Sequence, residues 1–392
     1  MDRTLRFACS LALALAATPA LASGEGTPRF TARVVFTNFG TAQLAGDGDT
    51  DAWFAGKVDA YLTVRGWEGF TLDLQPEYTY GRNPNGSGNG ALLPVNTAAA
   101  FPINNKADFD MALSVSQRID NATLTIGKIN MVTRAAATPI LGGGGREGFQ
   151  ALQLAAPVSF NTPPMVLGGL LVVPTARAQV VIGLWDAQDA TNRTDLHDAF
   201  QNGVSGFATV TLRKPWRGRM GFHSFTVGGT TERSLDLRSI PELIFPPGTG
   251  GATPSQREGG WQVRYAFQQF VRQDPAQPLR GWGVFGYASL WDGNPTLGRW
   301  SMGLGVAGNP SFTAARPDDR FGIGYYRFAP SSTLKRGLAP VFSVGDEQGL
   351  ELFYTFAFSA HFLLTANVQF IDPAPGGYAN DVFAGLRTNI QF

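Results

Sequence analysis

Cysteine and histidine are almost absent from this sequence. Among 392 residues there is one cysteine, Cys9, and it lies in the N-terminal apolar stretch. The remainder of the chain therefore has no thiol to form a disulfide or to bind a metal. The histidines, His197, His223 and His361, lie in separate segments, and none forms a pair with the spacing of a zinc site. We expect neither a metal site nor a cofactor.

Charge and long apolar runs are also scarce. Charged residues make up 16% of the chain, against roughly 25% in ordinary soluble domains. Beyond the N-terminal stretch there is no run of about 18 apolar residues, which excludes membrane-spanning helices. The net charge is +1, and no basic patch indicates a nucleic-acid partner. Aromatic residues are plentiful at 12%. This combination is typical of a β-barrel whose strands face lipid on one side and water on the other.

The N-terminus has the pattern of a secretory signal peptide. Two arginines precede an apolar stretch, Phe7–Ala17, and Ala20-Leu21-Ala22 forms a cleavage site of the small-x-small type. The apolar stretch is too short to span a bilayer, so an uncleaved anchor is the weaker interpretation. We expect residues 1–22 to be a signal peptide and residues 23–392 to form one outer-membrane barrel domain.

Apolar and polar residues alternate in segments of about the length that a tilted transmembrane strand needs. In the last segment, Val382, Leu386 and Ile390 share one face, whereas Arg387 and Asn389 share the other. A helix would scatter these residues around its surface. The same alternation recurs in residues 57–65, 70–80, 351–358 and 361–372.

A soluble sandwich would alternate as well, but two features favour a membrane barrel. Aromatic residues such as Trp261, Trp282 and Trp300 lie near the ends of candidate strands, as in interfacial girdles. The last strand ends in Phe392. Candidate strands number about seventeen and single-chain barrels have even counts. The expected fold is therefore all-β, a transmembrane antiparallel β-barrel of sixteen strands, with eighteen as the alternative.

Three long connections are rich in turn-forming residues: Arg82–Ala107, Thr133–Arg146 and Glu232–Glu258. Long loops of such barrels lie on the extracellular side. We expect one of them to fold into the barrel and to set the pore size. Arg82–Ala107 is the first candidate because it follows a strand with a strongly polar face, and Glu232–Glu258 is its rival.

Several motifs resemble those of a known family. They are Asn161-Thr-Pro-Pro-Met-Val-Leu-Gly, Gly183-Leu-Trp-Asp186, Gly281-Trp-Gly-Val-Phe-Gly286, Arg316-Pro-Asp-Asp-Arg-Phe-Gly-Ile-Gly-Tyr-Tyr326 and Asp346-Glu-Gln-Gly-Leu-Glu-Leu-Phe-Tyr354. In these stretches the chain resembles the carbohydrate-selective porins of the OprB family. The resemblance implies a sixteen-stranded pore that admits mono- and small oligosaccharides through the outer membrane of a Gram-negative cell. The sequence leaves open which sugar is carried and whether the barrels form a homotrimer in the membrane lipid.

Candidate substrate-binding residues are polar or aromatic side chains on expected pore-lining faces. They are Arg65, Asp73, Glu77, Arg264, Phe285, Tyr287, Trp291, Glu351 and Asn367. Each is also compatible with an ordinary solvated lumen position, because lumen faces are polar. Charges of both signs on these faces favour neutral sugars as partners over ions. The alternative is a general channel or one for organic acids or apolar solutes.

Two local motifs admit a structural and a functional interpretation. Arg316-Pro-Asp-Asp-Arg320 is either a turn held by Arg–Asp pairs, which we favour, or a charged rim of the pore. His223-Ser224 contains the residue types of a Ser/His hydrolase pair. Adjacent residues of one strand point to opposite faces, so these two side chains would not meet. We therefore expect no catalytic residues and no enzyme activity.

Overall fold

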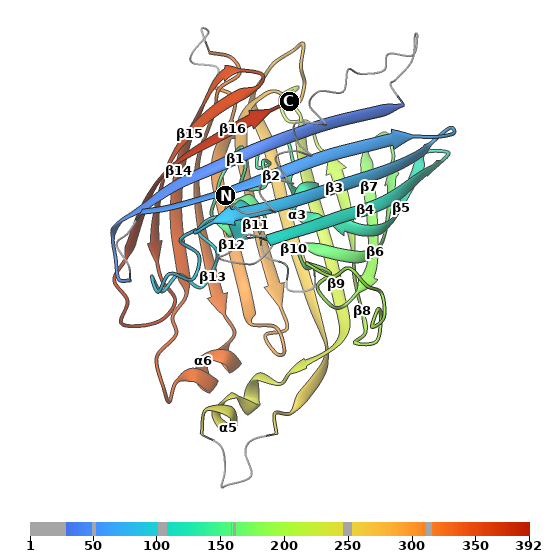
Figure 1. The fold of residues 1–392 in the computed structure, drawn as a ribbon. Helices are drawn as coiled ribbons and strands as arrows, with labels where there is room; N and C mark the ends of the chain where they lie inside the picture. Colours follow the sequence, from blue (N-terminus) through green and yellow to red (C-terminus); the bar gives the residue numbers. More distant parts are fainter. Residues whose placement is uncertain are drawn as a thin grey trace.

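The computed structural model describes residues 29–48, 52–100, 108–157, 159, 162–245, 253–310 and 316–392. Within these residues, sixteen antiparallel strands follow one another around a single closed barrel (Figure 1). This confirms the all-β barrel and the strand number expected from the alternation. The expected signal peptide, residues 1–22, lies outside the described residues.

The strands vary in length, and the longest of them lie at the start and in the middle of the chain. Their bounds are β1 Phe30–Ala45, β2 Ala52–Arg65, β3 Phe70–Gly81, β4 Asp108–Ile119, β5 Ala122–Asn130, β6 Met165–Pro174, β7 Ala178–Asp186, β8 Val204–Arg213, β9 Gly221–Leu235, β10 Gln256–Gln273, β11 Gly281–Trp291, β12 Gly298–Gly308, β13 Arg320–Pro330, β14 Glu347–Ser359, β15 Phe362–Asp372 and β16 Asp381–Gln391.

Short helices lie in the connections. Their bounds are α2 Thr97–Ala100, α3 Met131–Ala136, α4 Leu152–Ala155, α5 Ile240–Ile244 and α6 Ser332–Leu338, with a 3₁₀ turn over Leu237–Ser239. None of the helices in the described residues is long and apolar enough to cross a bilayer.

The last strand closes the barrel against the first. β16 pairs with β1 in a register that sets Thr37 opposite Asn389. Beyond the strand, Val34 and Phe392 exchange two backbone hydrogen bonds of 3.1 and 3.0 Å. Because the described strands form a closed ring, none of them has an unpaired edge. An open edge would expose unsatisfied peptide groups to the hydrocarbon of a bilayer. The alternation expected for β16 is confirmed, because the Leu386 side chain is 58% exposed and that of Arg387 is fully buried.

The two ends of the barrel differ in the length of their connections. One end carries short turns, among them residues 66–69, 120–121, 175–177 and 360–361, and we call it the short-turn end. The other end carries the connections 82–107, 131–164, 187–203, 236–255 and 331–346, and we call it the long-loop end. α5 and α6 project from the long-loop end, at the bottom of Figure 1.

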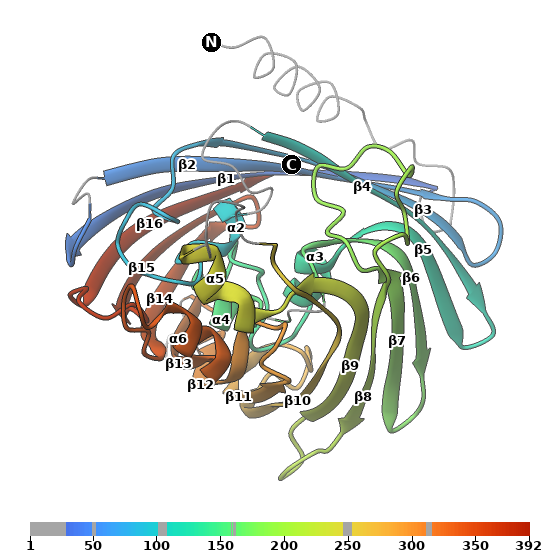
Figure 2. The same ribbon diagram turned by 90° about the horizontal axis from the view of Figure 1, so that it is seen from below.

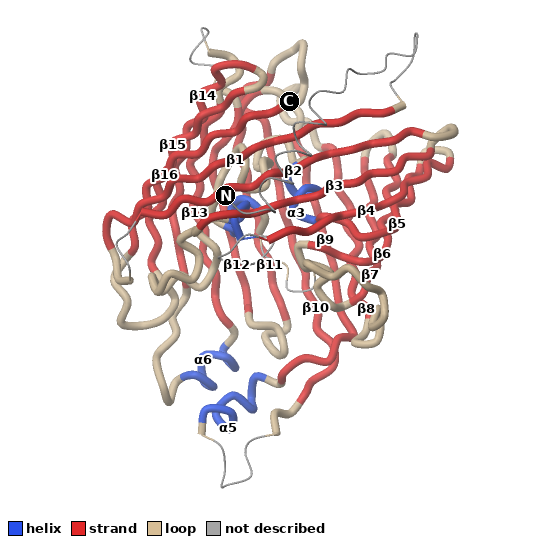
Figure 3. Tube along the Cα trace, viewed as in Figure 1, coloured by secondary structure: helices blue, strands red, loops and turns tan. Residues whose placement is uncertain are grey.

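Three of the short helices lie inside the outline of the barrel. The view along the barrel in Figure 2 shows α2, α3 and α4 enclosed by the ring of strands. The tube in Figure 3 shows α3 behind the front strands, away from α5 and α6. Two of the long connections therefore enter the barrel.

β6 is an exception to the alternation, because its sequence is apolar on both faces. Val166 and Leu170 are buried with Trp185 of β7, and Phe207 of β8 packs on this cluster. Trp185 and Phe207 meet edge to face at 5.3 Å between ring centroids. An apolar group inside the barrel therefore accounts for the apolar inner face of β6.

Candidate functional site

Two connections form a bridge across the interior. We call residues 83–100 the first inward segment and residues 131–157 the second inward segment. Thr97 donates to the carbonyl of Gln150 through its backbone N–H at 2.9 Å and its hydroxyl at 2.6 Å. Leu152 donates to the carbonyl of Pro94 at 3.0 Å. The two segments are thus joined to each other inside the barrel.

The loop that we expected to fold into the barrel was Arg82–Ala107. The described part of Arg82–Ala107 lies inside the barrel, where Ala98 and Ala99 pack against Phe39 and Ala55 of the wall. Residues 101–107 lie outside the described residues. The rival, Glu232–Glu258, instead contributes α5 at the end of the barrel, while its residues 246–252 lie outside the described part. The second inward segment was expected only as a loop, and its entry into the barrel was missed.

Polar side chains of the wall hold the second inward segment. Arg387 of β16 donates to the carbonyls of Gly145 and Gly148, both at 2.8 Å. Glu351 of β14 accepts the backbone N–H groups of Gln150 and Ala151, also at 2.8 Å. These contacts satisfy peptide groups that would otherwise be buried without partners. Glu351, expected as a pore-lining residue, therefore anchors the inward segment.

The first inward segment is held in the same manner. Glu347 of β14 accepts the N–H groups of Leu92 at 2.5 Å and Leu93 at 3.4 Å. Gln369 of β15 donates to the carbonyl of Val95 at 2.9 Å. The wall formed by β14–β16 is thus a docking surface for both segments.

An apolar contact supports this docking. Phe149 packs edge to face on Phe353 and Phe285, with centroid distances of 4.9 and 5.6 Å. Gly324 of β13 permits the approach, because a Cβ there would lie 3.0 Å from the ring of Phe149 and 2.9 Å from Leu154. The second inward segment therefore lies directly against the wall at β13.

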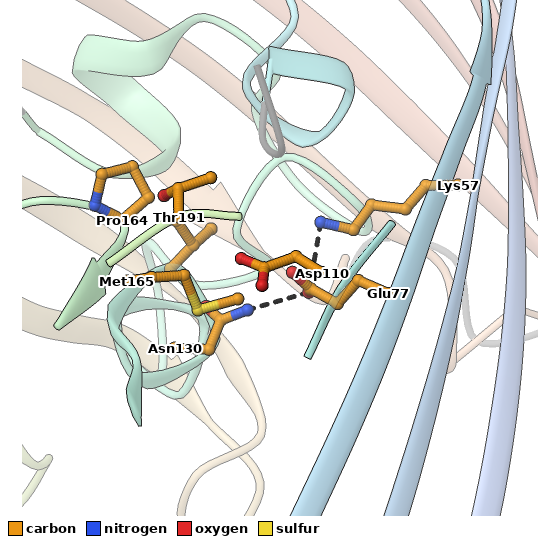
Figure 4. A pocket seen from close by; sticks show the side chains of 8 residues that line it. Lys57, Glu77, Asp110, Asn130, Pro164, Met165 and Thr191 are labelled. Carbon is orange, nitrogen blue, oxygen red and sulfur yellow. Dashed lines mark hydrogen bonds and ion pairs between the residues drawn. The ribbon is translucent and has the colours of Figure 1, made fainter. Parts of the chain in front are cut away.

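A network of paired charges lines β2 and β3 beside the inward segments. The Lys57 ammonium lies 3.2 Å from Glu77 and 3.8 Å from Asp59. Asn130 donates to Glu77 at 2.8 Å, and its own side chain accepts the N–H of Thr133 at the start of α3. Figure 4 shows Lys57 and Asn130 directed at the Glu77 carboxylate. Glu77 thus links the wall to the beginning of the second inward segment.

The same network reaches Arg146 of the second inward segment. Its guanidinium lies 2.8 Å from Asp59 and donates to the hydroxyl of Tyr61. Burial acts to lower the pKa of Arg146, but the carboxylate of Asp59 outweighs it and raises that pKa above its usual value. Asp59 and Arg146 were not among the expected site residues. The only signal for Arg146 was a single charge after four glycines, and its partner is far away in sequence.

The structure separates the other expected site residues. Asp73 of β3 accepts a hydrogen bond of 2.6 Å from the hydroxyl of Thr63, and Arg65 lies at the end of β2. Asn367 of β15 is buried opposite Gly385. Arg264 and Tyr287 meet, with the guanidinium carbon 5.0 Å from the ring centroid. Contact between any of these residues and a sugar stays a prediction.

The three expected aromatics of β11 share its inner face but are covered. Phe285, Tyr287 and Trp291 are 1%, 5% and 0% exposed. Tyr287 donates to Gln153 of the second inward segment at 2.7 Å, and Trp291 donates to Gln262 at 3.2 Å. Phe285, through Phe149, and Tyr287 therefore contact the second inward segment, whereas Trp291 bonds within the wall.

The motif before β13 has the structural role that we favoured. Arg316 binds Asp319 through two hydrogen bonds of 2.6 and 3.1 Å. Asp319 also accepts from the Tyr354 hydroxyl and the Ala357 N–H. Burial raises the pKa of Asp319, but these hydrogen bonds, that of Arg316 first, hold it below its usual value. The motif is a charged turn fixed to β14.

The side chains of His223 and Ser224 turn away from each other. His223 lies 2.7 Å from the Tyr265 hydroxyl, whereas Ser224 bonds to Thr211 at 2.8 Å. Within the described residues, no group of three or more His, Cys, Asp or Glu side chains is arranged to hold a metal ion.

A closed barrel with a polar inner wall and an internal bridge defines a class of protein, the β-barrel membrane channels. The sequence matches the family described as "Carbohydrate-selective porin, OprB family" over residues 58–392. The chain therefore belongs to the OprB family. No protein of curated function matches its sequence.

Solved structures agree with this fold. The high-pH structure of Pseudomonas putida OprB is similar over 93% of this chain and 94% of that chain, with 15% sequence identity and a TM-score of 0.77. The complex of Salmonella typhi OmpF with daunomycin is similar over 93% of this chain and 97% of that chain, with 10% identity and a TM-score of 0.58. At these identities the likeness establishes the porin fold.

Proposed function

We propose that this protein is a carbohydrate porin of the Gram-negative outer membrane, which lets mono- and small oligosaccharides diffuse passively. Family membership supports the class of solute. The observation that carries the proposal is the bridge formed by the two inward segments. The bridge narrows the lumen of the barrel, and polar side chains as well as apolar ones hold it in place. A pore for sugars needs such a narrowing, with polar groups that replace part of the hydration of the solute.

The charged network suits passage of an uncharged solute past β2 and β3. Lys57, Asp59, Glu77 and Arg146 neutralise one another at short range, and their field is screened beyond a Debye length of about 8 Å. At contact range they still offer donors and acceptors to hydroxyl groups. Binding should be weak, in the millimolar range or about −4 kcal/mol, because tighter binding would slow release.

The proposal includes export and cleavage. We propose that residues 1–22 are removed and that the mature protein begins at Ser23, as the small-x-small pattern indicates. Mass spectrometry of the protein isolated from outer membranes should show the mass of residues 23–392. An intact N-terminus in that fraction would contradict the cleavage.

Liposome swelling tests the sugar pathway. Vesicles that contain the purified protein should swell in isotonic glucose and more slowly in a trisaccharide. Vesicles with a heat-denatured sample should not swell, which controls for leakage of the lipid. Swelling in amino acids or succinate at least as fast as in glucose would replace the carbohydrate porin with a general or organic-acid channel.

A further inference from the structure

Arg264 is a cation of the inner wall with an unusual position. It lies at mid-length of β10, between Thr226 of β9 and Ser289 of β11 in the register of the sheet. Thr226 bonds to Thr209 of β8 at 2.8 Å, which continues the row of hydroxyls on this face. Trp261 and Val263, its neighbours along the strand, are exposed on the outer face of the barrel. Arg264 therefore points into the barrel from a wall of hydroxyl groups.

The contacts of Arg264 do not neutralise it. Its Nη1 lies 3.5 Å from the carbonyl of Pro157, and the guanidinium carbon lies 5.0 Å from the centre of the Tyr287 ring. Its Nε has no hydrogen-bond partner. It forms no ion pair with any carboxylate in the described part of the chain, although the side chain is half-buried. A partly desolvated cation without an acid partner favours the binding of an anion.

The surroundings of Arg264 have more donors than acceptors. The Ser289 hydroxyl and the Nε2 of Gln153 are buried without hydrogen-bond partners, and the Tyr287 hydroxyl already donates to Gln153. The inner-face residues beside Arg264 in the sheet register are Thr226, Ser289 and then Ser301, and none of them is an acid. A ligand rich in acceptor oxygens fits this environment best.

We propose that Arg264 binds the carboxylate of sugar acids, so that the pore retains uronates more strongly than the corresponding neutral sugars. This inference rests on the proposed carbohydrate pathway and names a solute class within it. The guanidinium supplies two parallel N–H groups for a carboxylate. The hydroxyls of the neighbouring strands, at two strand spacings or about 10 Å in all, face the remaining hydroxyls of the ring. The neutral network at β2 and β3 supplies no such cation.

Current block in planar bilayers tests this proposal with three solutes: glucose, glucuronate and acetate. In the wild type, glucuronate should block at about one tenth of the concentration that glucose needs, a difference of about 1.4 kcal/mol. Acetate, which has the charge without the ring, should block more weakly than glucuronate. Arg264→Gln should remove the advantage of glucuronate, and Arg264→Lys should restore part of it.

Arg213→Gln is the matched control, because Arg213 ends β8 at the short-turn end and is exposed. It removes the same charge and should leave the ratio of the two sugars unchanged. Equal block by glucose and glucuronate in the wild type would overturn the Arg264 proposal and leave the sugar pathway intact. Ion current that neither sugar blocks, together with no swelling in glucose, would overturn the proposed function itself. If Arg264→Gln fails to insert into the membrane, the proposal is still tested by the ratio of the blocking concentrations of glucose and glucuronate, measured in the wild type and in Arg264→Lys.

Discussion

Two groups of cations inside the barrel are held in opposite ways. On β2 and the second inward segment, Lys57 and Arg146 lie within ion-pair distance of Asp59, and Lys57 also pairs with Glu77. On β10, Arg264 has a carbonyl at 3.5 Å and an aromatic ring. The first state stabilises the position of an internal segment. The second leaves a charge available to a solute, so the same residue type has a structural role on one side and a binding role on the other.

The largest effect should follow from breaking the paired state. Asp59→Ala leaves the Arg146 guanidinium inside the barrel without its carboxylate. Loss of one partner from a buried pair costs about 3–5 kcal/mol, and urea unfolding of the refolded barrel in phospholipid vesicles should show it. Asp73→Ala is the control, because Asp73 accepts one hydrogen bond, from Thr63, and should cost about 1 kcal/mol. Equal stability of the two variants would show that the network does not hold the segment.

A smaller effect should follow from loosening the docking surface. Glu351→Gln removes the charge and one of the two acceptor oxygens that bind the N–H groups of Gln150 and Ala151. An N–H left without a partner costs about 1–3 kcal/mol. Single-channel conductance and its noise should rise as the second inward segment moves. Glu147→Gln on the same segment removes a half-exposed carboxylate that lies 3.9 Å from Arg320 of β13, and it should change both less than Glu351→Gln does. The same conductance in both variants would place the narrowing elsewhere.

A carboxylate introduced beside Arg264 should convert this unpaired cation into a paired one. Thr226→Asp places a carboxylate opposite Arg264 in the adjacent strand, where cross-strand Cβ atoms lie about 4.5–5.5 Å apart. The advantage of glucuronate over glucose in current block should fall about tenfold, or by 1.4 kcal/mol. Thr226→Asn has the same shape without the charge and should keep the advantage. Retention of the advantage in Thr226→Asp would contradict the role of an unpaired cation.

The smallest effect concerns a single hydroxyl. Ser289→Ala removes a group that has no partner in the structure, so stability should change little. If the hydroxyl donates to a bound sugar acid, the net worth of that hydrogen bond is about 0.5–1.5 kcal/mol. The half-blocking concentration of glucuronate should then rise about threefold. An unchanged value would remove Ser289 from the binding site and leave the role of Arg264 unaffected.

Alternation along the chain predicted the strands well where one face is polar. In β16 the register follows from Leu386 and Arg387, which lie on opposite faces as expected. The alternation fails in β6, because the partners of Val166 and Leu170, Trp185 and Phe207, come from other strands. A pattern within one strand carries no information about such contacts.

The candidate site was predictable only in part, because a sequence shows which residues are charged but not which groups they contact. Asp73 and Glu77 were expected to balance Arg65, Arg264 and Arg387 across the pore. The structure instead pairs Glu77 with Lys57 and directs Arg387 to the carbonyls of Gly145 and Gly148. These contacts depend on how the second inward segment folds back into the barrel. Sequence spacing does not reveal this, since Gln150 and Glu351 lie 201 residues apart.

The reversal potential across a gradient of KCl tests the contrast between the two states most directly. If Arg264 is the cation that a solute meets, the wild-type channel should prefer chloride to potassium, and Arg264→Gln should move the reversal potential toward zero. Asp73→Ala, a change of one charge at a residue outside both groups, should shift it less. A wild-type channel that prefers potassium, or a reversal potential that Arg264→Gln leaves unchanged, would contradict the account.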